Sequence, residues 1–263
     1  MNTIFDKIYI ISLISNKDRQ EFIKYQMKKL ELEYEFVYTI NFNDLKYDRF
    51  GNEIIYPNFV KEFNHLNNIS VYGCALAHYQ CILQAYEFGF NNVLVLEDDI
   101  CFVKDKELIS KYFNNIPKDC DFITYAPRFN DYDEFFKYRL YVKDNIKYDY
   151  ILVPNEYESL CGGMCYGIMN RNIMKVYLES QHKKLYVADR IEGIFSNSSI
   201  KRYASREAIC IDQFNRITHQ KDLGIFRCYQ QLNILHNYED YYKPLRYDGS
   251  NINKLINKIT TDN

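Results

Sequence analysis

This sequence of 263 residues lacks the features that are typical of nucleic-acid-binding proteins and of zinc fingers. Lys and Arg total 33 against 35 Asp and Glu, so the net charge is −2 and there is no positive excess of the kind that nucleic-acid-binding proteins carry. None of the eight Cys forms a CxxC pair, which argues against a zinc-finger type of site. We therefore expect no nucleic-acid partner, and most Cys to be small buried residues.

The N-terminal apolar segment, "IYIISLI", is too short to span a bilayer, and no small-residue cleavage site follows it. We expect a cytoplasmic protein with reduced thiols. Internal repeats and low-complexity linkers are also lacking. We expect one large α/β domain over residues 1–240, followed by an amphipathic C-terminal tail over 241–263.

The first forty residues have the pattern of a strand, a helix and a second strand. The apolar run at 7–13 predicts a buried strand, and Ile23, Met27 and Leu30 recur at helical spacing within 15–30. The segment "YEFVYTI" that follows is typical of another strand. This order predicts a βαβ unit, the opening of a parallel sheet.

Further helices and strands are predicted in the same way, from helical spacing of apolar residues and from apolar runs. Residues 72–89 have the apolar spacing of a helix that ends near a glycine, and they lead into a strand of pure aliphatics, Val93 to Leu96. The remaining expectations are strands at 120–127 and 206–211, a helix at 171–180, and a hairpin or edge excursion at 131–154.

Three carboxylates, Glu97, Asp98 and Asp99, follow the aliphatic strand directly. Adjacent acids repel one another and cannot be buried unpaired, so they belong where the strand emerges, in water or around a cation. Ligands of open α/β sheets bind at this carboxyl edge. A solvated strand end is the alternative.

Three motifs occur in a familiar order: "IYIISL" with "DRQEF" at the N-terminus, "GCALAH" at 73–78, and "VLVLEDDI". Together they resemble glycosyltransferase family 25, whose members build bacterial lipooligosaccharide. "CGGMCYGIM" is similar to that family's Gly-Thr-x-x-Tyr segment, and "YVADRIEGIF" to its Pro-Val-Asp segment. The chain departs from the family at Val71, Ala77 and Gly163, positions where an acid, a Ser and a Thr are usual.

The resemblance implies an A-type glycosyltransferase (GT-A) fold: a Rossmann-like, mixed and mostly parallel sheet flanked by helices. The nucleotide would bind in the first half, about 1–130, and the acceptor in the second, about 131–240. The implied reaction is inverting transfer of a hexose, galactose from UDP-galactose in the first place, to a hydroxyl of a lipooligosaccharide or other surface glycan.

The resemblance also implies roles for the acid triplet and for Arg19. A divalent cation, Mn²⁺ first, would stabilise the diphosphate leaving group, with Asp99 as its direct ligand and Glu97 near the ion or its waters. Asp98 would face the ribose or sugar of the donor. Arg19 is either a surface helix residue or a group near the nucleotide.

Four further positions are candidates in the second half of the chain. Gly162 and Gly163 form either an ordinary turn or a close backbone approach to the donor. Asp189 is compatible with capping a helix and with serving as the catalytic base. Asp212 is the second candidate for the base, or for a metal contact.

His78 has two interpretations, as a hydrogen-bonded core histidine or as a site residue.

Two other function classes also stay open. A sugar-nucleotide nucleotidyltransferase would share the sheet and acids, but "SLISNKDR" after the first strand contains no glycine. A non-catalytic carbohydrate-binding relative would lack the metal acids. The basic C-terminal tail is compatible with a helix packed on the domain and with peripheral contact with the inner membrane, where a lipid-linked acceptor would lie.

Overall fold

The computed structural model describes residues 3–39, 69–102, 104–125, 149–153, 165–183, 195, 199–206 and 209–212. Within these ranges it contains a seven-stranded sheet with the strand order β2-β1-β3-β7-β5-β8-β6, and a two-stranded sheet of β4 and β9. The strands are β1 Lys7–Leu13, β2 Glu35–Thr39, β3 Val93–Glu97, β4 Ile100–Phe102, β5 Phe122–Thr124, β6 Tyr150–Leu152, β7 Cys165–Ile168, β8 Arg202–Ser205 and β9 Cys210–Asp212. The helices are α1 Lys17–Leu30, α3 Ile69–Glu87, α4 Lys106–Asn114 and α6 Arg171–Lys183.

The large sheet is mixed, as predicted. β1 pairs in parallel with both β2 and β3, and β5 pairs in parallel with β8, whereas the β3–β7, β7–β5 and β8–β6 pairs are antiparallel. Five of the seven strands therefore run in one direction, with β7 and β6 opposed to them. The predicted α/β class, a mixed sheet flanked by helices, is confirmed.

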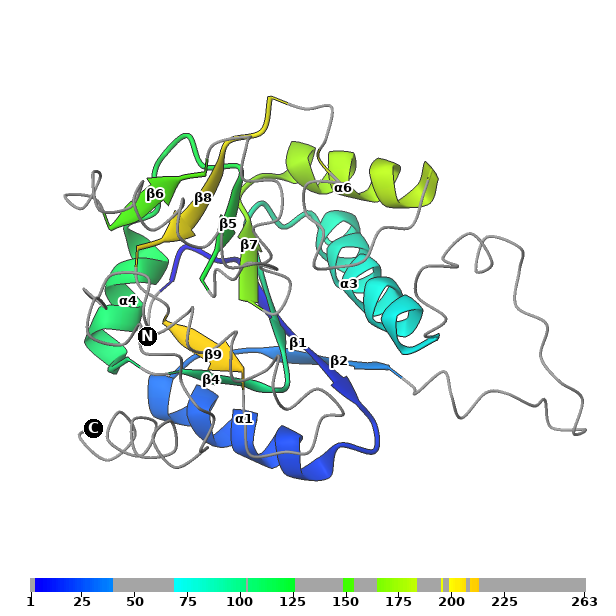
Figure 1. Ribbon diagram of the computed structural model, residues 1–263, viewed down its shortest axis with the longest axis vertical. Coiled ribbons are helices and arrows are strands. Elements are labelled where there is room, and N and C mark those ends of the chain that lie inside the picture. Colours follow the sequence, from blue (N-terminus) through cyan, green and yellow to red (C-terminus); the bar gives the residue numbers. More distant parts are fainter. Residues whose placement is uncertain are drawn as a thin grey trace, which may run out of the picture.

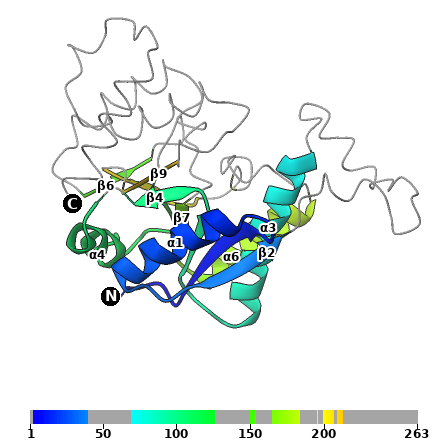
Figure 2. The same ribbon diagram turned by 90° about the horizontal axis from the view of Figure 1, so that it is seen from below.

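Alternating side chains of the central strands build a core on each face of the sheet. Ile8 and Ile10 of β1 pack in a cluster with residues of α1 and α4, while Tyr9 and Ile11 pack in a second cluster with residues of α3 and α6. Figure 1 accordingly shows α1 and α3 on opposite sides of β1 and β2. Seen from below, α1 lies against the β1–β2 side of the sheet (Figure 2). Both faces are covered, which explains why β1 and β3 are continuous apolar runs.

Two local features, a glycine turn and a set of side-chain hydrogen bonds, fix the position of β3. Gly89, with a φ of +79°, follows α3 and lets the chain turn back, because L-residues with a side chain rarely adopt that conformation. After the turn, the Asp6 carboxylate accepts hydrogen bonds from the backbone N–H groups of Asn91 (2.7 Å) and Asn92 (3.0 Å). β3 therefore begins at a fixed position beside β1.

None of the helices in the described ranges has the length and apolar character that crossing a bilayer requires.

Candidate active site at the carboxyl end of β3

The site begins where two parallel strands end side by side. In the β1–β3 register Ile11 lies opposite Glu97, so Ser12 and Leu13 at the end of β1 are next to the acids at the end of β3. α1 begins four residues after β1, and its first turn carries Arg19. The βαβ unit at the start of the chain therefore positions the Arg19 guanidinium beside the acid triplet. Parallel sheets bind ligands at this edge.

Asp98 is the buried member of the triplet, with a residue exposure of only 5%. Its Oδ2 accepts a 2.6 Å hydrogen bond from the Ser12 hydroxyl and a longer one, 3.5 Å, from the Asn16 amide. Its Oδ1 accepts from Arg19 at 3.2 Å. Three donors from β1 and the start of α1 stabilise a carboxylate that would be costly to bury alone.

Arg19 bridges Asp98 and Asp99, which it contacts at 3.2 and 3.3 Å through the same Nη1. Burial lowers the pKa of the guanidinium, but the charges of Asp99 and Asp98 outweigh burial, and the net pKa of Arg19 is raised. Arg19 is thus fixed as a cation at the strand ends, which is what a site for an anionic diphosphate requires. Its side chain is 24% exposed, so the guanidinium is partly buried but still reaches solvent.

Two glutamines hold the backbone around this cluster. The Gln20 amide donates to the Leu13 carbonyl at 2.8 Å and to the Ser12 hydroxyl at 3.3 Å, which orients the hydroxyl that Asp98 accepts. The Gln26 amide donates to the Ile100 carbonyl at 3.1 Å, and its Oε1 accepts from the Phe102 N–H at 2.7 Å. α1 therefore fixes the chain on both sides of the acids.

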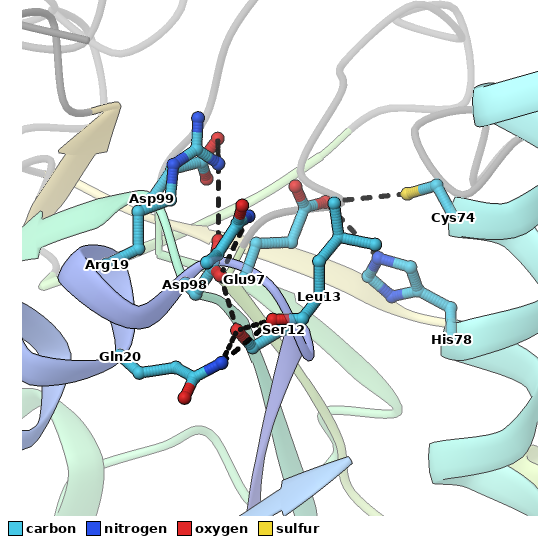
Figure 3. Close-up of polar contacts among 10 residues, drawn as sticks. Ser12, Leu13, Arg19, Gln20, Cys74, His78, Glu97, Asp98 and Asp99 are labelled. Atoms are coloured by element: carbon cyan, nitrogen blue, oxygen red, sulfur yellow. Dashed lines mark hydrogen bonds and ion pairs between the residues drawn. The ribbon is translucent and has the colours of Figure 1, made fainter. Parts of the chain in front are cut away.

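Glu97 has a different set of neighbours from Asp98 and Asp99. Its Oε1 lies 3.2 Å from Nε2 of His78 and 4.0 Å from Sγ of Cys74, both on α3. Figure 3 shows Glu97 between the two groups, with Arg19 and Asp99 on one side and the two α3 side chains on the other. The adjacent acids of the triplet thus contact different helices.

His78 combines the two interpretations given above. It is fully buried, and its Nδ1 lies 3.1 Å from the hydroxyl of Tyr166 in β7. Its other ring nitrogen reaches Glu97. His78 is therefore a hydrogen-bonded core histidine that also extends to the site.

The carboxylates of Glu97 and Asp99 are the type of ligand that a hard divalent cation takes. The side chains of Glu97 and Asp99 are 25% and 27% exposed, so both carboxylates lie at the border between core and solvent. Hard divalent cations take such oxygen ligands and keep positions for phosphate. Arg19 shares Asp99, so a cation there would neutralise the same carboxylate that the guanidinium contacts. The assignments of Glu97 and Asp99 to the metal, and of Asp98 and Arg19 to the donor, stay predictions.

Three candidate positions, Gly162, Gly163 and Asp189, lie outside the described residues. Gly162 and Gly163 precede Cys165, the first residue of β7, which pairs with Leu96 directly before the acid triplet. Asp212 is described in its backbone, which lies opposite Ile100 in the β4–β9 pair. This register brings the Asp212 backbone next to the residue that follows Asp99.

Six contributors to the site were not expected from the sequence, among them Asn16 before α1 and Gln26 within it. Ser12, Gln20 and Cys74 stand in the motifs "IYIISL", "DRQEF" and "GCALAH", and Tyr166 in "CGGMCYGIM". The sequence does contain an indication for Ser12, which is a polar residue at the end of an otherwise apolar strand and is buried in the structure. The contacts of Tyr166 depend on the pairing of β7 with β3, which no local pattern shows.

The chain is similar to a known protein family and to a solved structure. The profile of "Glycosyltransferase family 25 (LPS biosynthesis protein)" matches residues 5–191, about seven-tenths of the chain. Curated protein sequences give no match. Among solved structures, the crystal structure of a glycosyltransferase involved in the glycosylation of the major capsid of PBCV-1 is similar, with a TM-score of 0.40 and 10% identity, over 86% of this chain and 97% of that one.

Proposed function

Because the chain belongs to glycosyltransferase family 25, we propose that it transfers a hexose from a UDP-sugar, UDP-galactose first, to a hydroxyl of a lipooligosaccharide or another surface glycan. The transfer is metal-dependent and inverts the anomeric centre. The observation that carries the proposal is the meeting of Arg19 with Asp98 and Asp99 at the shared carboxyl end of β1 and β3.

The proposed donor site uses Arg19 as its fixed positive charge. A UDP-sugar carries two phosphates, and cleavage at the sugar leaves an additional negative charge on the diphosphate. A guanidinium that is already held by two carboxylates needs little reorganisation to meet such a charge. Asp98 supports this role by fixing Arg19, and any contact of Asp98 with the ribose or sugar would use an oxygen that Ser12 or Arg19 now contacts.

Asp99 and Glu97 are the residues proposed to hold a divalent cation, with Mn²⁺ as the first choice. When bound, such an ion supplies a Lewis acid that stabilises the leaving diphosphate. Asp99 lies beside Arg19, so the protein places a carboxylate and a guanidinium at one strand end. The guanidinium limits the net negative charge there when no cation is bound.

The acceptor side is proposed from the second half of the chain. In an inverting displacement the acceptor hydroxyl loses its proton as it attacks, so a carboxylate base is needed on the face opposite UDP. Asp189, within the matched family region, is the first choice for this base, and Asp212 the second. Gly162 and Gly163 are proposed to let the backbone approach the donor closely.

A donor screen tests the proposal. Release of UDP is measured for several UDP-sugars, with and without a lipooligosaccharide acceptor, in Mn²⁺ or a chelator. We expect UDP-galactose, Mn²⁺ and acceptor to be needed together for the fastest release. A nucleotidyltransferase would form UDP-sugar from UTP and sugar phosphate, and a carbohydrate-binding relative would release no UDP. Either result would contradict the proposal.

A further inference from the structure

Cys74, His78 and Glu97 form a cluster of three different metal-ligand types outside the Arg19–Asp98–Asp99 group. The atoms that each residue offers, a thiol sulfur, an imidazole nitrogen and a carboxylate oxygen, all lie within 4.8 Å of one another. We propose that this cluster is a second cation site, which binds a transition-metal ion of the Zn²⁺ class.

The distances are close to those of an assembled zinc shell. With bonds of about 2.0 to 2.3 Å and tetrahedral angles, neighbouring zinc ligands lie roughly 3.2 to 3.6 Å apart. His78 Nε2 and Glu97 Oε1 are already 3.2 Å apart. Cys74 Sγ lies 4.0 Å from the same oxygen, and all three atoms lie within 4.8 Å of one another, so the shell closes with side-chain movements of about 1 Å or less. Both Cys74 and Glu97 are partly exposed, so their side chains have room for this adjustment.

The scaffold of the cluster is fixed before any ion binds. Cys74 and His78 are four residues apart on α3, so they occupy one face of the helix, and Glu97 ends a central strand. The His78 ring stacks on Tyr166 with ring centroids 5.6 Å apart, and Tyr166 contacts the second ring nitrogen. Metal-binding histidines usually have such an outer partner, which fixes the ring orientation and tautomer.

Tyr166 is suited to this supporting role because it stays neutral. Burial raises the pKa of its hydroxyl well above the ordinary value. It is hydrogen-bonded in turn to Tyr177 of α6. A neutral hydroxyl can accept the Nδ1–H of His78 when Nε2 binds an ion, or donate to Nδ1 when Nε2–H points to Glu97.

The chemistry of the ligands separates this site from the proposed donor site. Thiolate and imidazole favour Zn²⁺ and related ions, whereas carboxylates alone suit Mg²⁺ or Mn²⁺. Three protein ligands leave a fourth position for water or a substrate atom. On binding, the Cys74 thiol gives its proton to the buffer, and the resulting thiolate sulfur forms the bond to the ion. Glu97 belongs to both proposals, so an ion held with Cys74 and His78 would leave Asp99 as the direct ligand of the donor-site cation, with Glu97 near that cation or its waters.

Titration of the intact metal-free chain with Co²⁺ tests the site, because cobalt bound to a thiolate gives a charge-transfer absorption. We expect one Co²⁺ per chain with this band, displacement by Zn²⁺, and no displacement by the same concentration of Mn²⁺. Cys74→Ser should remove the band. His78→Gln should weaken Co²⁺ binding by at least about 10- to 100-fold, the range for loss of even an outer partner.

Cys101→Ser is the matched control, because Cys101 is also partly exposed but lies on β4 outside the cluster. Its band should equal that of the intact chain. Absence of the band in the intact chain, its persistence in Cys74→Ser, or its loss in Cys101→Ser would overturn the site and leave a hydrogen-bonded trio. Metal binding alone is measured, so neither result depends on the proposed transferase activity.

Discussion

The three acids at the end of β3 have different surroundings although they are adjacent in the chain. Asp98 is buried under Ser12 and Arg19, Asp99 shares Arg19 at the border with solvent, and Glu97 contacts His78 on α3. The sequence predicts that acids here must be paired or solvated, because three adjacent charges cannot be buried alone. It does not predict which acid meets which helix, since that depends on how α1 and α3 pack.

Replacement of Arg19 tests whether its pairing with Asp98 stabilises the fold. Arg19→Gln leaves the buried Asp98 carboxylate with Ser12 and Asn16 but without its cation, so we expect the free energy of unfolding to fall by about 1 to 3 kcal/mol. Urea denaturation measures it. Lys24→Gln is the control, because it removes only exposed contacts, an ion pair with Glu21 and a contact of the ammonium with the Phe36 ring, and should change stability much less than Arg19→Gln. Equal losses in the two variants would contradict a structural role for Arg19.

Asp189 is predicted to be the catalytic base. Asp189→Asn keeps the size of the side chain and much of its capping ability, so a loss of rate would come from the lost base. We expect kcat to fall by roughly 10²- to 10⁴-fold with nearly unchanged UDP affinity, because the base contacts the acceptor and not the nucleotide. Steady-state kinetics and UDP titration measure the two quantities. Near-normal turnover would move the role to Asp212, whose variant is then measured in the same way.

At the scale of elements, the strong patterns predict the structure well and the short segments do not. β1, α1, β2 and β3 were expected because their buried faces repeat over several residues. β7 and β8 have only four residues each, too few for a periodicity. α3 begins at Ile69, three residues before the predicted start.

α4 was missed although its sequence contains a signal. Asp105 caps the helix by accepting the Leu108 N–H at 2.7 Å, and the buried Ile109, Tyr112 and Phe113 have helical spacing. The predicted strand at 206–211 is β9 at Cys210–Asp212, so its start was placed too early. Short pairs such as β4–β9 are set by contacts between distant segments, which local sequence does not contain.

Gly167 in β7 tests how tightly the central strands pack. A Cβ at this position would lie 2.7 Å from Phe5 Cε1 and 2.9 Å from Ile123 Cγ2, both of which are buried. Gly167→Ala should therefore lower the free energy of unfolding by about 1 to 3 kcal/mol, the usual cost of overpacking. Urea denaturation of the same substitution in a Phe5→Leu background should give a smaller loss, because most of the clash is removed. Equal losses in both backgrounds would contradict a clash with Phe5.

At the scale of the whole molecule, the proposed site lies where α1, β1 and β3 meet, and these elements come from the first hundred residues. All three elements fall within the predicted nucleotide-binding half at about 1–130. The acceptor half at about 131–240 and the tail at 241–263 lie largely or wholly outside the described residues. The division into halves stays a prediction.

Two interpretations of the tail are open: a helix packed on the domain, or a segment that rests on an anionic membrane surface. Lys243, Arg246, Lys254 and Lys258 alternate with Tyr and Ile residues, a pattern that suits an interfacial segment. In a sedimentation assay, vesicles with anionic lipid should retain the intact chain more than neutral vesicles, and less in high salt. A chain lacking residues 241–263 should stay in solution. No retention of the intact chain, or equal retention of the two chains, would show that the tail does not bind membranes.

The most direct test of the central claim, that the carboxyl end of β3 binds a metal and a UDP-sugar, is calorimetric titration of UDP into the intact chain and Asp99→Asn. Both are measured with Mn²⁺ and with a chelator. We predict that Mn²⁺ strengthens UDP binding to the intact chain and has no effect in Asp99→Asn, while circular dichroism shows both chains folded. UDP affinity that depends on Mn²⁺ equally in the two chains would contradict the claim.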